Sequence, residues 1–402
     1  MHRVMEYIFG RRRLVVKSGT NDSFELLFLI WKIIGVEHSR SYGFFQLFHV
    51  FCCWALLLYS PAAYNMGFLR ALKTLPMASA LNILQTDINV SILLFKVVII
   101  KFHLKRLRSL RDIFKRLDER YHNPEERAQI DESVAICRRI IYIYIFVYFT
   151  FAFLSWITAI MAGELIYSLW LPFVELIPHQ GWQYWARFSV EAFYLYFLIL
   201  VCLICDVYPA VYIRAIRTHV HLLAGRISRL GSNPDLSAEE NHQELVDCIL
   251  SHQELMRVVE VVSAVTSLTL FLQFTVAAMI LCVCMLNALI FADRAGQIMT
   301  VGYYMGVLLQ TGGACFQASM LEAECVKLPL AIFHCQWLNL DRHSRSLLTF
   351  FMQRAQVNVC FTAIKLFQIN LRTNLSLAKF SFTLYTFMNE MGFGGDTNEK
   401  IS

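Results

Sequence analysis

Apolar residues are gathered into long runs along the chain, each close to the length that a membrane-spanning helix needs. A helix requires about 20 mostly apolar residues to cross a hydrocarbon core of roughly 30 Å. We predict seven spans, over residues 44–64, 77–100, 140–162, 189–213, 259–291, 298–320 and a split last element over 347–388. The fifth run is longer than one crossing requires, so its start is expected to project from the membrane.

The composition agrees with this pattern. Of the 402 residues, 57% are hydrophobic and 16% are charged, and the mean hydropathy is +0.50. Soluble domains have about 45–50% apolar and about 25% charged residues. This difference excludes soluble, disordered and disulfide-stapled secreted folds. The sequence predicts an all-α polytopic membrane protein, with residues 1–402 forming a single seven-span domain.

The distribution of Lys and Arg predicts the orientation of the chain in the membrane. With the N-terminus inside, the inner segments carry 27 Lys and Arg residues and the outer segments carry 5. Because positive residues concentrate on the cytoplasmic side, we expect the N-terminus inside and the C-terminus outside, opposite to a G-protein-coupled receptor. The net charge of +6 is explained by this topology, so we expect no nucleic-acid partner.

The predicted inner segments have helical patterns of their own. Leucine and phenylalanine recur at helical spacing over 104–117 against a basic face, Asn123 with Pro124 forms a helix start, and Ser237 with Glu240 forms a capping box. Either these segments are surface helices at the lipid headgroups, or the spans extend into a cytoplasmic bundle where subunits pack. We name residues 1–43 as a cytoplasmic N-terminus and 101–139, 214–258 and 321–357 as a cytoplasmic anchor.

No catalytic or phosphate-binding motif is found in the chain, so an enzyme is not expected. Cys202 and Cys205 form a CxxC within an apolar run without a second pair nearby, which favours buried small side chains over a zinc site. We therefore expect neither a cofactor nor a metal. Asp87 lies within the second span and would suit a transporter, but no inverted repeat accompanies it.

The outer halves of several spans are rich in aromatic residues, and the segment 163–188 is long enough to roof a pocket between them. Small volatile ligands need an apolar enclosed pocket with few polar groups, although aromatic belts at the membrane interface give a similar pattern. The candidate ligand-binding residues are Gln85, Phe149, Ala152, Phe153, Trp156, Phe193, Tyr194, Phe197, Tyr303 and Tyr304.

The last helix, predicted over 374–390, has a polar stripe that a lone lipid-embedded helix would not tolerate. Lys379, Thr383, Thr386 and Glu390 fall on one face. Each central charge costs roughly 2.5–3.5 kcal/mol on insertion scales. Such a stripe favours a helix that lines an aqueous pore, with packing against sibling spans as the alternative.

The C-terminal region resembles the insect odorant receptor family. The resemblance rests on residues 331–337, 347–356 and 377–386, and the length and seven-span plan are similar over the whole chain. Val357 and Asn358 depart from it, since the family often has a proline there. The ending around Phe387 differs from that of the related gustatory receptors.

The resemblance implies an odorant-gated, non-selective cation channel in the plasma membrane of sensory neurons. It implies a heterotetramer with a shared coreceptor, and the short segment 214–257 indicates a ligand-tuning subunit rather than the coreceptor itself. It places Tyr385 and Asn389 towards the pore, whereas the polar stripe centres on Thr383 and Thr386. The two faces overlap near Phe382, and we keep both as alternatives for the face that lines the pore. A gustatory-type or G-protein-coupled receptor and a small-molecule transporter are the alternatives.

Overall fold

The computed structural model describes residues 19–37, 43–163, 165, 167, 169–176, 178, 180–291 and 294–390. The side chains of Tyr385 and Asn389, two predicted pore residues, lie outside the described set, together with those of Ala162, Glu175, Gln180, Ala295, Leu384 and Met388.

The described chain is almost entirely helical, with one short hairpin near its end. The elements are η1 (Thr20–Ser23), α2 (Glu25–Ile33), α3 (Phe44–Thr74), α4 (Met77–Glu119), α5 (Pro124–Ala162), α6 (Pro172–Glu175), α7 (Gln180–Ser228), α8 (Ala238–Leu286), the π-helix η2 (Asn287–Phe291), α9 (Arg294–His334), η3 (Trp337–Asn339), α10 (Arg342–Ala355), β1 (Thr362–Ala363), β2 (Phe367–Gln368) and α11 (Leu371–Glu390). The two strands pair antiparallel.

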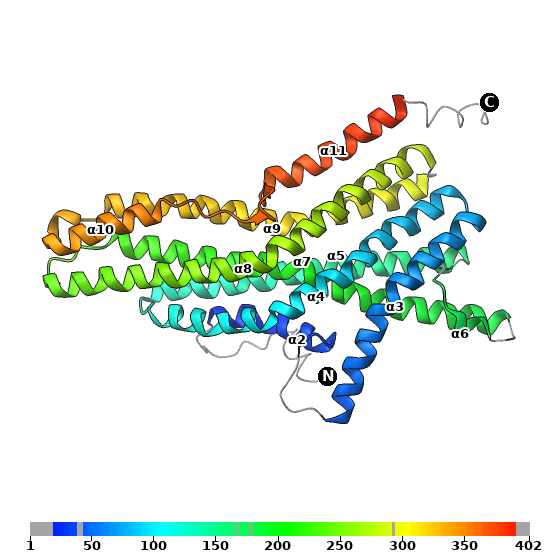
Figure 1. Cartoon of the computed structure of the whole chain (residues 1–402), viewed down its shortest axis with the longest axis horizontal. Coiled ribbons are helices and arrows are strands. Elements are labelled where there is room, and N and C mark those ends of the chain that lie inside the picture. The colour runs from blue at the N-terminus through cyan, green and yellow to red at the C-terminus, as the bar shows by residue number, and fades with distance from the viewer. Residues whose placement is uncertain are drawn as a thin grey trace.

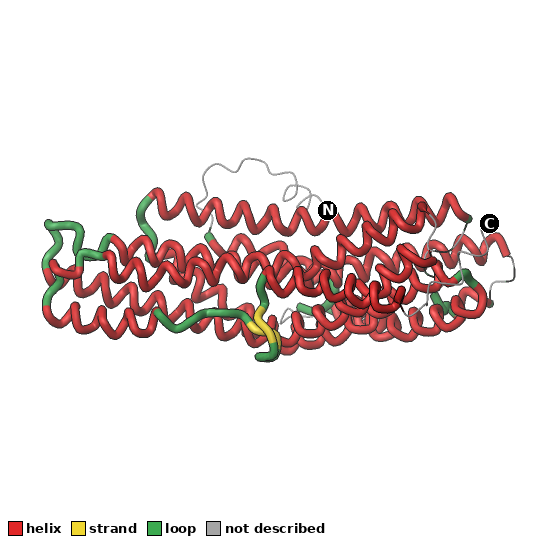
Figure 2. Tube along the Cα trace, turned by 90° about the horizontal axis from the view of Figure 1, so that it is seen from above, coloured by secondary structure: helices red, strands yellow, loops and turns green. Residues whose placement is uncertain are grey.

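The long helices run side by side along the length of the molecule and separate towards one end (Figures 1 and 2). We call the end with the α7–α8 turn the bundle end, where α4, α5, α7, α8, α9 and α10 gather. We call the other end the splayed end, where α11 diverges from the rest (Figure 1). The helix α7 packs against α5, α8 and α9, and its residues Val207, Tyr208 and Ala210 are fully buried.

Five of the described helices, namely α3, α4, α5, α7 and α8, are long and apolar enough to cross a membrane. The helices α9 and α11, at the sixth and seventh predicted spans, fall outside that set. They carry polar side chains such as Gln310 and Lys379, which lower their hydropathy.

The predicted helix starts are confirmed by cap geometry. The Asn123 side chain accepts a hydrogen bond from the Glu125 backbone N–H at 3.1 Å, with Pro124 at the first position of α5. Ser237 and Glu240 form the reciprocal capping box at the start of α8. Each cap satisfies backbone donors that a helix start leaves unpaired, so these two helices begin where the sequence requires.

The predicted inner segments continue the spanning helices and do not form separate surface helices, whereas their cytoplasmic location and the packing of subunits there stay predictions. The helix α4 extends without a break to Glu119, and Leu107, Phe114 and Leu117 on its far half are fully buried. The N-terminal segment also docks there, since the Thr20 hydroxyl donates to Asp118 Oδ1 at 2.7 Å. A bundle of helices, not a layer of separate surface helices, forms this end.

Candidate functional site

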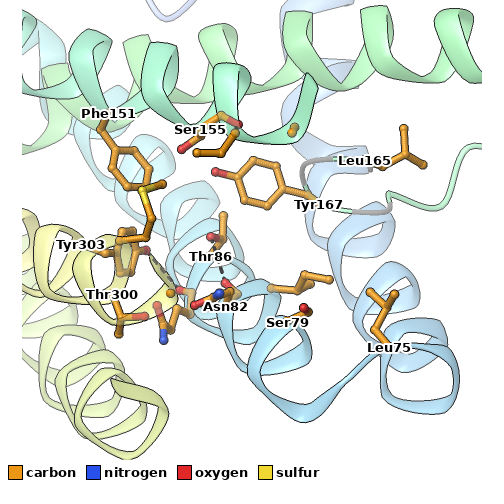
Figure 3. A pocket seen from close by; sticks show the side chains of 16 residues that line it. Leu75, Ser79, Asn82, Thr86, Phe151, Ser155, Leu165, Tyr167, Thr300 and Tyr303 are labelled. Atoms are coloured by element: carbon orange, nitrogen blue, oxygen red, sulfur yellow. Dashed lines mark hydrogen bonds between the residues drawn. The ribbon is translucent and has the colours of Figure 1, made fainter. Parts of the chain in front are cut away.

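A chamber lies at the splayed end between α4, α5 and α9 (Figure 3). Its volume is about 270 Å³. We call it the outer chamber, and its lining residues are Leu75, Ser79, Asn82, Ile83, Gln85, Thr86, Phe151, Ser155, Thr158, Ala159, Leu165, Tyr167, Gly296, Met299, Thr300 and Tyr303. The mixture of aromatic, aliphatic and hydroxyl side chains suits a small organic molecule.

The polar side chains of the outer chamber are mostly occupied by one another or by the helix backbone. The Thr86 hydroxyl donates to the Asn82 carbonyl at 3.4 Å, and the Tyr303 hydroxyl donates to the Gln85 carbonyl at 3.3 Å. The Asn82 side chain accepts from Asn287 at 2.8 Å. These bonds hold the walls together and leave few polar groups for a ligand.

A smaller inner chamber of about 80 Å³ adjoins the outer one. The two share Thr86, Phe151, Tyr167 and Tyr303 as lining residues. Aliphatic side chains, Leu93, Leu195, Leu198 and Ile199 among them, form much of the inner wall. The inner chamber is therefore shaped for a hydrocarbon group.

The inner chamber adjoins a buried charge pair. Lys96 on α4 contacts Asp206 on α7 at 2.5 Å, and both side chains are at most 2% exposed. Lys96 also donates to Gln273 Oε1 at 2.7 Å, and Tyr148 donates to Asp206 Oδ2 at 2.7 Å. Tyr148 lines the inner chamber.

The network extends from that pair to α9. Gln273 Nε2 donates to Gln310 Oε1 at 2.7 Å, and Gln310 also lines the inner chamber. Because α4, α5, α7, α8 and α9 all contribute, one hydrogen-bonded unit joins five helices beside the chamber.

The segment between α5 and α7 roofs the outer chamber through Leu165 and Tyr167, and Figure 3 shows the Tyr167 ring between Ser155 and Thr86. The fully buried Glu191 accepts the backbone N–H groups of Tyr167 at 3.2 Å and Leu169 at 2.8 Å. The tryptophans of the predicted roof segment, Trp170, Trp182 and Trp185, line neither chamber, and Trp182 is 73% exposed. A carboxylate on α7 thus fixes the roof.

Two of the predicted ligand-binding residues, Gln85 and Tyr303, line the outer chamber. The structure does not bring the other candidates to it. Phe153 and Phe193 are exposed on the outer surface, and Ala152 and Tyr194 are buried in the core. Phe149 packs on Tyr196, Trp156 stacks on Phe188, and Phe197 packs against the core. Tyr304 contacts α11.

On α5 a different face reaches the chamber than the aromatic residues suggested. Phe151, Ser155, Thr158 and Ala159 line it, at spacings that place them on one side of a helix. Ser155 and Thr158 are polar residues in an apolar span, which is the signal that identifies this face. Tyr167 lies outside any helix, and no sequence pattern marked it.

The final helix α11 packs through Asn374 and Ser381, which are buried. The predicted pore residues Phe382, Thr383 and Thr386 are exposed, and Phe382 is 57% exposed. The backbone of Tyr385 and Asn389 belongs to the helix. The polar stripe is therefore on the side of α11 that the rest of the chain leaves open.

Of the other candidate residues, Cys202 lines the inner chamber, whereas Asp87 and Cys205 line neither chamber. Asp87 is buried and accepts from the Ser91 hydroxyl at 3.4 Å. Cys202 and Cys205 are free buried thiols. Within the part of the chain that the structure describes, no cluster of His, Cys, Asp or Glu is placed to hold a metal.

The fold has solved relatives. The insect olfactory receptor OR5 from Machilis hrabei superposes with a TM-score of 0.75 at 18% identity, covering 92% of this chain and 97% of that one. The same receptor in complex with eugenol superposes with a TM-score of 0.74 at 18% identity, covering 96% and 100% of the two chains. The chain therefore has the seven-helix membrane fold predicted from its sequence.

Sequence comparisons agree with the fold. Odorant receptor 98a of Drosophila melanogaster is 28% identical over 334 residues, 83% of this chain and 84% of that receptor. Odorant receptor 43b of the same species is 29% identical over 372 residues, 92% and 91% of the two chains. The sequence model of the 7tm Odorant receptor family matches residues 76–382. The chain belongs to this family of odorant receptors.

Proposed function

We propose that this odorant receptor is a subunit of an odorant-gated cation channel in the plasma membrane. A small volatile ligand binds in the two chambers and shifts the channel towards an open state whose pore is lined by α11. A coreceptor subunit completes the assembly. The bundle end lies in the cytoplasm, as the excess of Lys and Arg in the predicted inner segments supports.

The observation that carries the proposal is the connection that α9 makes between chamber and last helix. Tyr303 lines both chambers, and the hydroxyl of the next residue, Tyr304, lies 3.1 Å from Ser381 Oγ on α11. Two turns on, the Thr311 hydroxyl donates to Asn374 Oδ1 at 2.5 Å. A ligand that displaces α9 therefore acts directly on α11.

The exposed stripe of α11 supports a pore role. Lys379, Thr383, Thr386 and Glu390 are all exposed in the single chain. Each charge would be costly in lipid, by roughly 2.5–3.5 kcal/mol at the membrane centre, and an aqueous path shared between subunits removes that cost. Phe382, Tyr385 and Asn389 complete the proposed pore set.

Ligand binding is supported by the chambers themselves. Gln85 and Tyr303 contact the ligand directly in this proposal, whereas Phe149, Trp156 and Tyr194 act through the packing of the walls. The eugenol bound by the Machilis receptor is a small aromatic volatile compound, a size class that the two chambers also suit. A ligand acts on the channel only through its different affinity for the closed and open states.

The test of the channel is electrical recording from cells that express this chain with an insect coreceptor, during application of small esters, ketones, alcohols and aromatic compounds. Odorant-evoked cation current is expected from the pair and not from either chain alone. Silence across the panel, with both chains at the cell surface, would refute the proposal.

Cysteine substitution tests the pore. Thr386→Cys on the exposed side of α11 is expected to make the odorant-evoked current sensitive to charged thiol reagents. Ser381→Cys, on the packed side of the same helix, is the matched control and should stay insensitive. Block of the control but not of Thr386→Cys would place the pore on another face.

A further inference from the structure

Gln85 lines the outer chamber, and its hydrogen bonds are incomplete. Its residue is 2% exposed, and its Nε2 atom has no hydrogen-bond partner among the described residues. A buried amide donor without a partner costs free energy, which a ligand acceptor recovers. The terminal torsion of glutamine is soft, so the amide turns towards an acceptor in the chamber at little cost.

Several neighbouring hydroxyl groups are already used as donors. The hydroxyl hydrogens of Thr86, Thr158 and Tyr303 are engaged by the backbone carbonyls of Asn82, Leu154 and Gln85. Gln85 Nε2 differs from these three groups, because it is buried without a partner among the described residues, which favours it as a donor for a bound molecule.

The walls also define the charge of the ligand. The described residues that line the two chambers include neither Lys, Arg and His nor Asp and Glu. A charged ligand would lose its hydration without gaining a counter-ion, which is costly in a low-dielectric site. The ligand is therefore neutral.

We infer that Gln85 donates a hydrogen bond from Nε2 to the carbonyl oxygen of a short-chain ketone or ester. The oxygen lies in the outer chamber, and the alkyl chain extends past Thr86 and Tyr303 into the inner chamber, where Leu93, Leu198 and Ile199 surround it. This inference rests on the proposed ligand site and names the chemical class that the site selects.

The test compares two molecules of nearly equal shape, 2-heptanone and 2-methyl-1-heptene, in which a methylene group replaces the carbonyl oxygen. Binding is measured as ligand-dependent thermal stabilisation of the purified chain in detergent, so the readout does not need the coreceptor. For the wild type, the ketone is expected to bind about tenfold more tightly, the ratio that corresponds to about 1.4 kcal/mol for one hydrogen bond.

The variant Gln85→Leu keeps much of the side-chain volume and removes the amide, so the tenfold preference should disappear while the hydrocarbon still binds. Thr86→Val is the matched control, because it lines both chambers and its hydroxyl hydrogen is already engaged, and the preference should survive there. An unchanged preference in Gln85→Leu, or a preference of the wild type for alcohols that depends on Gln85, would overturn the inference. If neither probe stabilises the wild type, the ligand site of the proposed function fails instead.

Discussion

At the scale of single residues, the Lys96–Asp206 pair places two charges in the interior, where both side chains are at most 2% exposed. Removing two charges from water is expensive, and the pair is tolerated because Gln273, Tyr148 and Cys202 also bond to it. The sequence contains a hint of this pair, since one Lys and one Asp lie within two different apolar spans. Only the structure shows that they meet.

Replacing one member of this pair should destabilise the protein strongly. Lys96→Met leaves Asp206 buried without its counter-ion, at a cost of about 3–5 kcal/mol. The double variant Lys96→Met/Asp206→Leu removes both charges and should recover most of that loss. Thermal unfolding in detergent measures both, with the exposed Lys105→Met as control. A double variant as unstable as the single one would show that the charges themselves are required.

His252 at the bundle end makes stability depend on pH. Burial, with a further contribution from Arg354, lowers the pKa of His252 to about 4. The unfolded chain, with a pKa near 6.5, therefore binds more protons between about pH 6.5 and 4, and stability falls as the pH falls through this range, by at most about 1.4 kcal/mol per pH unit.

The variant His252→Phe isolates this effect, because it keeps a ring against Phe351 and cannot titrate. Thermal unfolding between pH 7 and 5 should show a smaller loss in the variant than in the wild type. Parallel losses would assign the pH dependence to other groups.

The sequence indicated aromatic walls at the outer end but not which residues face inward. On α5, Phe151 lines the chamber while Phe153 is 53% exposed. Lipid and an apolar ligand are similar surroundings, so hydrophobicity does not distinguish the lipid-facing side of a membrane helix from its chamber-facing side. Polar residues do distinguish the two sides, since Ser155 and Thr158 mark the side of α5 that faces the chamber. The position of Tyr167 depends on its loop, which periodicity does not describe.

At the scale of elements, the predicted helix starts were accurate because local capping chemistry determines them. The connections between helices depend on contacts that are distant in sequence. In the α7–α8 turn, Gly231 has φ of +72°, and an added Cβ would lie 2.5 Å from the Gln336 carbonyl oxygen. That close approach joins the turn to the end of α9 and has no local signature.

The variant Gly231→Ala should be destabilised, by about 1 kcal/mol for the positive φ alone and further by the clash. Gly225→Ala is the matched control, since a Cβ at that position, within α7, meets nothing within 4 Å. It should gain about 0.5–1 kcal/mol. Chemical or thermal unfolding of the two variants measures the difference, and equal stabilities would contradict the structural role of the turn.

The contact between α9 and α11 should govern gating rather than binding. Tyr304→Phe removes the hydroxyl that contacts Ser381, and one hydrogen bond of about 1 kcal/mol corresponds to about a fivefold shift of the opening equilibrium. The maximal odorant current should change. The midpoint, that is, the ligand concentration that gives half of the maximal thermal stabilisation, should stay the same. Tyr303→Phe, facing the chamber, should move that midpoint. If Tyr304→Phe moved that midpoint and Tyr303→Phe changed only the maximal current, the proposed coupling between the chamber and α11 would be contradicted.

At the scale of the whole molecule, the seven spans and their bundle-end extensions follow from the sequence to a large degree. The positions of α3 and α4 agree with the predicted first residues, Phe44 and Met77. The last element is divided as expected, with α10 and α11 on either side of the hairpin. The exposed stripe of α11 has no covering surface in the described part of this chain, and in the proposed assembly it faces the pore shared with other subunits.

The length of the central helices has a mechanical consequence. The helices α7 and α8 each contain 49 residues, which is about 74 Å of rise, against a hydrocarbon core of roughly 30 Å. More than half of each helix therefore lies beyond what a single crossing requires, and these extensions form the bundle end (Figure 1). Four residues of α7 between Leu195 and Cys202 line the inner chamber. One continuous helix thus joins the wall of the chamber to the bundle end, so that a displacement at one is transmitted to the other along a single rigid element.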